Sequence, residues 1–249
     1  MPSVIVQSSG SFDDGYLLKS GSVSGIEAAR NVTTAQSGNV SASTILAFHG
    51  KVFANAYLYR TLINFDLSGN DIDGDSLSGN TVESATITVV TLANLSGFSN
   101  ITAQTSNSLY LCKTDGISTS FNTADWNALD GWVSSGSYDG EVTVYSTANE
   151  AAGTTITFTL NSECISDINS AISGGDAVFP LAILNQDDFL SNVGTGGLGS
   201  PNTTGGFAQF DGVRFTSKEA SGSDCFRLNL TYASESAVVE NAVFFGTNF

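Results

Sequence analysis

The 249-residue sequence has little positive charge, little histidine and no long apolar run, and each shortage excludes a class of function. Only eight lysines and arginines stand against 24 aspartates and glutamates, which gives a formal net charge of −16. Such a chain has no basic surface to neutralise phosphates, so nucleic acid is excluded as a partner. No run of about 18 apolar residues occurs, so membrane insertion is not expected. With one histidine and no Cys-x-x-Cys pair, the sequence also lacks a structural zinc motif.

Cysteines and export signals are also sparse. Cys112, Cys164 and Cys225 are odd in number and far apart, which favours three buried thiols over a disulfide framework. One disulfide with one free thiol is the alternative. The first residues lack the basic region and the long apolar region of an export signal, so we expect that a signal was removed or that this route is not used.

What the sequence does contain is a repeated pattern of short β-strands. Runs rich in Val, Ile, Thr, Phe and Tyr recur between Gly, Ser, Asn and Asp residues, which is typical of an antiparallel sandwich or barrel. Apolar and hydroxyl residues alternate in 82–90, so one face is predicted to pack inward and the other to meet water. The predicted strands are residues 4–7, 14–19, 44–53, 57–65, 82–92, 108–113, 142–146, 154–160, 178–184, 213–216, 226–232 and 238–245.

Only two segments favour a helix. Residues 123–133 place apolar side chains three positions apart after an aspartate that suits a helix start. Residues 161–175 begin with Asn161 or Ser162 as an N-cap, repeat isoleucine at helical spacing and end in two glycines. We therefore expect an all-β fold with one or two short helices.

The order of these segments resembles that of DNRLRE-type jelly-roll domains. The strand "YRTLINFDLS" precedes "VESATITVV", and "GVRFTSKEASGSDCFRLNLTY" supplies a Ser-x-Glu turn before a Leu-x-Leu-x-Tyr strand. The matching residues are Arg60, Leu62, Phe65, Asp66, Ala85, Ser217, Glu219, Leu228, Leu230 and Tyr232. The resemblance covers roughly residues 11–232 and implies a two-sheet antiparallel jelly-roll sandwich. Residues 1–232 are expected to form this single domain, and residues 233–249 a C-terminal apolar arm or additional strand.

Four aspartates crowd the loop after the signature strand and offer the hard oxygen donors that calcium takes. They are Asp66, Asp71, Asp73 and Asp75. The loop is not an EF-hand, because Ser76 stands where a glycine should turn the chain and Val82 where the bidentate glutamate belongs. A hydrated turn, a looser calcium site and a catalytic role for the aspartates remain as interpretations.

A cluster of aromatic residues follows in the middle of the chain. Tryptophan and tyrosine rings are the platforms on which sugars stack, so this cluster is a candidate glycan-binding site; packing of both tryptophans in the core is the alternative. The candidates are Trp126, Trp132, Tyr138 and Tyr145.

Two further polar residues have structural interpretations. Arg60 is expected to form a salt bridge with Glu219 or another carboxylate near the sheet edge. His49, the single histidine, has no nucleophile-elbow motif beside it, so no Ser-His-Asp set is predicted.

The C-terminal residues carry a second apolar cluster beyond the last strand of the resemblance. Exposed on a monomer, such a strand would aggregate, so we expect it to pair with its own sheet or with that of a neighbouring copy. The predicted interface residues are Val238, Val239, Val243, Phe244, Phe245 and Phe249.

The resemblance implies two classes of function, since such domains occur as carbohydrate-binding-like appendages of secreted bacterial proteins and similar jelly rolls build phage and other viral particles. The leading hypothesis is a non-enzymatic structural protein of a phage-like virion, in a capsid decoration or tail. It would form a homo-oligomer, contact other virion proteins and require no cofactor. The alternative is a carbohydrate-binding module, extracellular or on a cell surface, that binds a glycan with calcium as a structural ion. A polysaccharide-cleaving enzyme rests on fold analogy alone.

Overall fold

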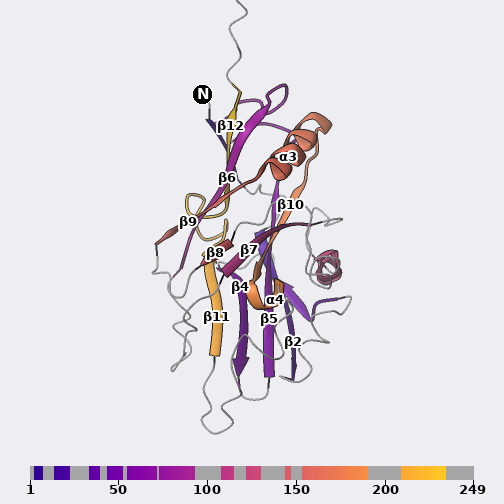
Figure 1. Cartoon of the computed structure of the whole chain (residues 1–249), viewed down its shortest axis with the longest axis vertical. Helices are drawn as coiled ribbons and strands as arrows, with labels where there is room; N and C mark the ends of the chain where they lie inside the picture. Colours follow the sequence, from indigo (N-terminus) through magenta and orange to yellow (C-terminus); the bar gives the residue numbers. More distant parts are fainter. Residues whose placement is uncertain are drawn as a thin grey trace, which may run out of the picture.

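The computed structural model describes residues 3–7, 14–22, 34–39, 44–52, 55–71, 73–92, 108–114, 122–129, 144–146, 153–189 and 209–233. Within these ranges the chain forms one four-stranded and one eight-stranded β-sheet, and all paired strands are antiparallel (Figure 1). The predicted all-β fold, a two-sheet antiparallel sandwich, is confirmed.

The smaller sheet contains strands from both ends of the described chain. Its order is β1 (Ser3–Gln7), β12 (Arg227–Tyr232), β6 (Val82–Val90) and β9 (Thr155–Thr159). The burial pattern alternates along β6, β9 and β12, so apolar residues pack inward and hydroxyl residues lie on the outer face. The predicted alternation in β6 is therefore confirmed.

The larger sheet combines hairpin neighbours with distant segments. Its main order is β11 (Gln209–Thr216), β4 (Thr44–Val52), β5 (Asn55–Phe65), β10 (Phe179–Asn185), β7 (Ser108–Lys113) and β8 (Val144–Ser146). β2 (Asp14–Ser22) pairs with β5 and with the short β3 (Ser37–Asn39). Neighbours that are far apart in sequence, such as β4 and β11 or β5 and β10, are typical of jelly-roll connections.

β5 has three partner strands, because two of them share one of its edges. β2 pairs with residues 55–63 along one edge. β4 pairs with 55–59 and β10 with 61–65, so these two strands share the opposite edge. They change over at Arg60, where the sheet divides around a buried side chain.

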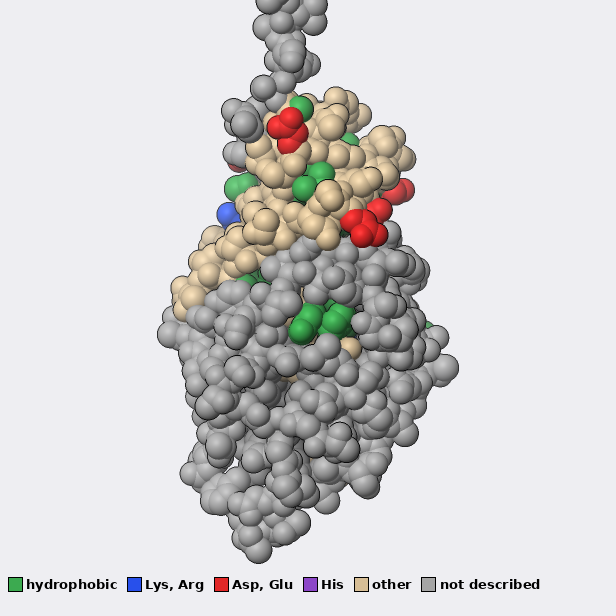
Figure 2. Space-filling model, viewed as in Figure 1, with side chains coloured by type: hydrophobic (Ala, Val, Ile, Leu, Met, Phe, Trp, Pro, Cys, Tyr) green, Lys and Arg blue, Asp and Glu red, His purple; other side chains and the backbone are tan. Residues whose placement is uncertain are grey.

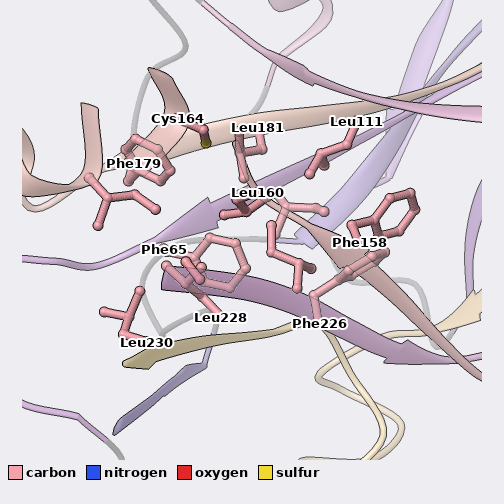
Figure 3. Close-up of a cluster of buried hydrophobic side chains, with 14 of the residues drawn as sticks. Phe65, Leu111, Phe158, Leu160, Cys164, Phe179, Leu181, Phe226, Leu228 and Leu230 are labelled. Atoms are coloured by element: carbon pink, nitrogen blue, oxygen red, sulfur yellow. The ribbon is translucent and has the colours of Figure 1, made fainter. Parts of the chain in front are cut away.

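One hydrophobic core joins the inner faces of both sheets. Figure 3 shows Phe65 of β5, Phe158 of β9 and Leu228 of β12 pointing toward one another from different strands. Phe226, just before β12, meets Phe215 of β11 edge to face with ring centroids 5.1 Å apart. Each fully buried side chain of this kind contributes about 2–3 kcal/mol relative to exposure.

The one long helix covers the end of this core. α3 (Ser162–Gly174) begins at Asn161, whose side chain accepts hydrogen bonds from the backbone of Glu163 and Cys164. It ends at Gly175, which has φ +69°, a left-handed conformation that suits glycine. Its buried face includes Ile168 and Ile172, as the spacing predicted.

The remaining elements are short. Residues Thr123–Leu129 form a 3-10 helix, η1, within the segment predicted to be helical, and Gln186–Phe189 form a one-turn helix, α4. Eleven of the twelve predicted strands lie where strands are found, whereas β3 and α4 were not predicted; the twelfth, 238–245, lies outside the described residues. No helix in the described ranges is long and apolar enough to cross a membrane.

Candidate functional site

The outer face of the four-stranded sheet is a regular polar surface. The strand register places Thr157 of β9 beside Thr88 of β6, and Thr88 beside Arg227 of β12. In the next row Thr159, Thr86 and Asn229 stand side by side. On β6, β9 and β12 these six side chains are mainly short hydroxyl and amide groups, all at least partly exposed, and the apolar Ile5 of β1 and Val90 of β6 lie on the same face.

Asn229 fixes the centre of this face. Its Nδ2 group donates to Thr88 Oγ1 at 3.1 Å and to the carbonyl of Thr86 at 3.4 Å. Both acceptors lie on the neighbouring strand β6, so the amide bridges β12 and β6 on the outer side. These hydrogen bonds hold the amide between the two strands.

This sheet carries almost none of the charge of the protein. Its four strands contain one acid, Glu83, and one base, Arg227, so the formal charges of the strands cancel. The whole chain has a net charge of −16. In Figure 2 the coloured, described part of the surface shows only a few separate acidic side chains. Copies of an acidic protein repel each other least through such a surface.

Among the described strands β9 forms one edge of this sheet, and its own sequence carries none of the usual devices against pairing with another strand. Leu160 donates its backbone N–H to Ala85 of β6, and the carbonyl of Thr154 accepts from Thr91, so these alternate residues direct their backbone groups toward β6. Thr155 and Thr157 consequently direct theirs to the other side, away from β6. The strand "TITFT" contains no charge, proline or bulge, the usual devices that prevent edge pairing.

β1 forms the opposite edge and is equally unprotected. Its sequence "SVIVQ" is uncharged, and in the described part of the chain it pairs only with β12. Ser3 lies opposite Thr231, so β12 ends beside the start of β1, and the next residue, Ala233, donates its backbone N–H to the carbonyl of Thr81. The predicted interface residues in 238–249 lie outside the described residues, and their pairing stays a prediction.

The aspartate loop folds around one side chain. Asp71 Oδ1 accepts the backbone N–H groups of Asp73 at 3.0 Å and Asp75 at 2.7 Å, and Asp66 Oδ1 caps Ser68 in the same way at 2.9 Å. This turn chemistry is what short carboxylates supply in loops. The geometry fits the hydrated-turn interpretation.

The loop offers little to a cation. Asp73 and Asp75 are exposed, whereas Asp71 is buried and already used by the backbone. Among the described residues no three acidic, cysteine or histidine side chains are grouped so that they could hold a metal ion. Calcium binding by Asp66, Asp71, Asp73 and Asp75 stays a prediction to which this arrangement adds no support.

Arg60 lies in a buried polar cluster at the division of the large sheet. Its Nε and Nη2 groups donate to the two carboxylate oxygens of Asp188 at 2.6 and 2.9 Å, and its Nη1 donates to the carbonyl of Trp126 at 3.2 Å. The guanidinium carbon lies 3.8 Å from the centroid of the Trp126 ring. The expected salt bridge of Arg60 is therefore present, with Asp188 as the other carboxylate rather than Glu219, which is an exposed residue in the turn after β11.

The aromatic residues proposed to bind glycans separate into three cases. Trp126 is fully buried beneath Arg60, so its assignment as a sugar-stacking ring is wrong and the core interpretation holds. Tyr145 belongs to β8, whose backbone alone is described, and Trp132 and Tyr138 lie outside the described residues. Their role in glycan binding stays a prediction.

All three cysteines are buried thiols outside any disulfide, as the first interpretation predicted. Burial, with the nearby Asp188 carboxylate, holds the pKa of the Cys112 thiol well above its ordinary value. Burial likewise raises the pKa of Cys225 to about 11. Neither is a reactive thiolate at neutral pH.

The comparisons with known proteins assign no family to this chain. No family model matches the sequence, and no curated protein sequence matches it.

Proposed function

We propose that this protein is a non-enzymatic structural subunit of a phage-like particle, in which copies join through the edges of the four-stranded sheet. The observation that carries the proposal is the pair of uncharged, unprotected edge strands, β1 and β9, in a chain of net charge −16. Main-chain hydrogen bonds across such edges extend a sheet from one subunit into the next.

Three features support this proposal. The strands of the sheet carry no net charge, so apposed copies pay little electrostatic cost there. β12 ends beside the start of β1, so an arm formed by the residues after it would begin next to this edge. Finally, Arg60, Asp188 and Asp71 are engaged in internal contacts, so these groups serve the fold rather than a reaction.

One of the four candidate rings of the carbohydrate-binding alternative, Trp126, is buried and unavailable to a sugar. The virion assignment itself draws on the resemblance to DNRLRE-type and viral jelly rolls. Capsid, portal or tail genes beside the coding sequence would agree with it. A cluster of polysaccharide-degrading genes would contradict it in favour of the glycan-binding module.

Assembly through the β9 edge can be tested by a substitution at Thr157. We expect the unaltered chain to form oligomers in size-exclusion chromatography with light scattering, and Thr157→Pro to reduce their mass. The Thr157 N–H points away from β6, so proline removes a donor from the edge without removing a bond to β6. Thr157→Ala keeps the N–H and is the matched control.

The outcomes are distinct. Oligomers in the control and a smaller species for the proline variant agree with assembly through β9. If the proline variant stays fully assembled, a chain ending at residue 234 tests whether the contact depends on the C-terminal segment. An unaltered chain that is monomeric over the whole concentration range contradicts the proposal.

A further inference from the structure

Asp14, the first residue of β2, is a buried acid that the proposed assembly does not use. Its side chain is fully buried, and its Oδ2 accepts the backbone N–H of Lys218 at 3.1 Å. The other oxygen, Oδ1, is buried, and no described residue donates a hydrogen bond to it. An ionised carboxylate with one uncompensated oxygen is costly at such a site.

The turn that Asp14 holds connects the two sheets. Residues 217–226 lead from β11 of the large sheet to β12 of the small sheet. On one side the turn and the strand before it are fastened to the end of β6, since Val90 donates to the carbonyl of Asp224 and Leu92 to that of Arg214. On the other side the Asp14 bond to Lys218 fastens the turn to β2. Asp14 is therefore part of the contact between the layers.

A second carboxyl group lies against Asp14. The charge of Glu219 and a hydrogen bond to its side chain both raise the pKa of Asp14, and two carboxyl groups share such a bond only when one of them carries a proton. The Lys218 charge, from the same turn, lowers the pKa of Asp14. The Cys225 thiol, just before β12, feels the Asp14 charge, which raises its pKa, whereas Arg227 and Lys218 lower it. These are the titratable groups that act at Asp14 among the residues described.

We propose that Asp14 keeps its proton on the acidic side of neutral pH, and that this proton makes its contact with the 217–226 turn a pH-sensitive latch between the two sheets. The protonated carboxyl donates to Glu219 while its carbonyl oxygen accepts from Lys218. Loss of the proton leaves two adjacent carboxylates, one of them buried, and weakens the attachment of the turn to β2. Asp14 and the 217–226 turn belong to one copy of the chain, so this contact does not depend on assembly.

Burial, the neighbouring Glu219 charge and the bond between the two carboxyls raise the pKa of Asp14 from its ordinary 3.8 to about 7, against the lowering effects of Lys218. Between pH 3.8 and about pH 7, the folded state keeps a proton that the unfolded chain has lost. The free energy of unfolding must therefore fall as the pH rises between these values and level off above pH 7. The latch is closed on the acidic side and weakened on the alkaline side.

The test compares urea unfolding of the full chain and of Asp14→Asn between pH 4.5 and 8.5. Asparagine imitates the protonated carboxyl, since its amide can donate to Glu219 while its oxygen accepts from Lys218. The unfolding constant of the unaltered chain, relative to that of Asp14→Asn, is expected to rise by about tenfold per pH unit between roughly pH 5 and 6.5. Identical pH profiles for the two proteins would overturn the proposal.

A second measurement does not depend on the Asn variant folding. The carbon-13 shift of the Asp14 carboxyl should titrate with a midpoint near neutral pH, and Glu219→Gln, a change at an exposed residue, should lower that midpoint by removing the neighbouring charge. A midpoint near pH 4 overturns the inference. A second result would also overturn it: the unaltered chain is more stable at pH 8 with calcium than with EDTA, and Asp14→Asn abolishes this difference. A cation rather than a proton would then lie between the two carboxyls.

Discussion

Removal of Arg60 should destabilise the protein more than any change of a surface charge. The side chains of Arg60 and Asp188 are only 1% and 2% exposed, and they share a bidentate ion pair. Arg60→Met leaves the Asp188 carboxylate buried without its partner and removes the cation over the Trp126 ring. Breaking a buried pair from one side costs about 3–5 kcal/mol, which includes the penalty of the orphaned charge.

The double variant Arg60→Met, Asp188→Leu separates the orphaned charge from the loss of packing. It removes both charges, so we expect it to recover at least half of the stability that the single variant loses. For a chain of this size the single variant should melt about 10 °C lower. Urea and thermal unfolding, both followed by circular dichroism, measure the unaltered chain, Arg60→Met, Asp188→Leu and the double variant. A single-variant cost under about 1 kcal/mol, or a double variant as unstable as the sum of the two single changes, would refute the reasoning.

Two smaller perturbations test the local turns. Asn161→Ala removes the cap that serves two backbone donors at the start of α3, and should cost about 1 kcal/mol in urea unfolding; an unchanged midpoint would contradict the capping role. Asp71→Ala should cost about 1–2 kcal/mol, since two backbone N–H groups lose their acceptor. The exposed Asp73→Ala should leave stability within about 0.5 kcal/mol, and equal losses in the two aspartate variants would show that the loop is not organised around Asp71.

The parts of the fold that sequence reasoning predicted are those with local causes. The helix α3 was predictable because its cap, its isoleucine spacing and its terminal glycines all lie within 161–175. β6 was predictable because alternation is itself the signal of a half-buried strand. The two-sheet class followed from the repetition of such strands.

Long-range contacts were not predictable in the same way. Asp188 lies 128 residues after Arg60, in a one-turn helix with no periodicity to mark it, so the pairing could not be read from spacing. Asp14 looked like an ordinary strand start, and its burial depends on a turn 204 residues away. The unprotected character of β1 and β9 depended on knowing the strand order, because a sequence pattern does not identify which strands lie at an edge.

The three partners of β5 also determine the order in which the protein can fold. Its pairs with β4 join residues at most 11 positions apart, from Phe48 with Tyr59 to Val52 with Asn55. Its pairs with β10 join residues more than 110 positions apart, such as Phe179 with Phe65. Closing the longer loop makes the β5–β10 pairing far slower to form than the β4–β5 hairpin. The hairpin can therefore form early, whereas residues 61–65 on the same edge of β5 pair only after β10 is present. During synthesis the fully buried half of β5, residues 61–65, therefore remains without its β10 partner until more than 110 further residues have been made.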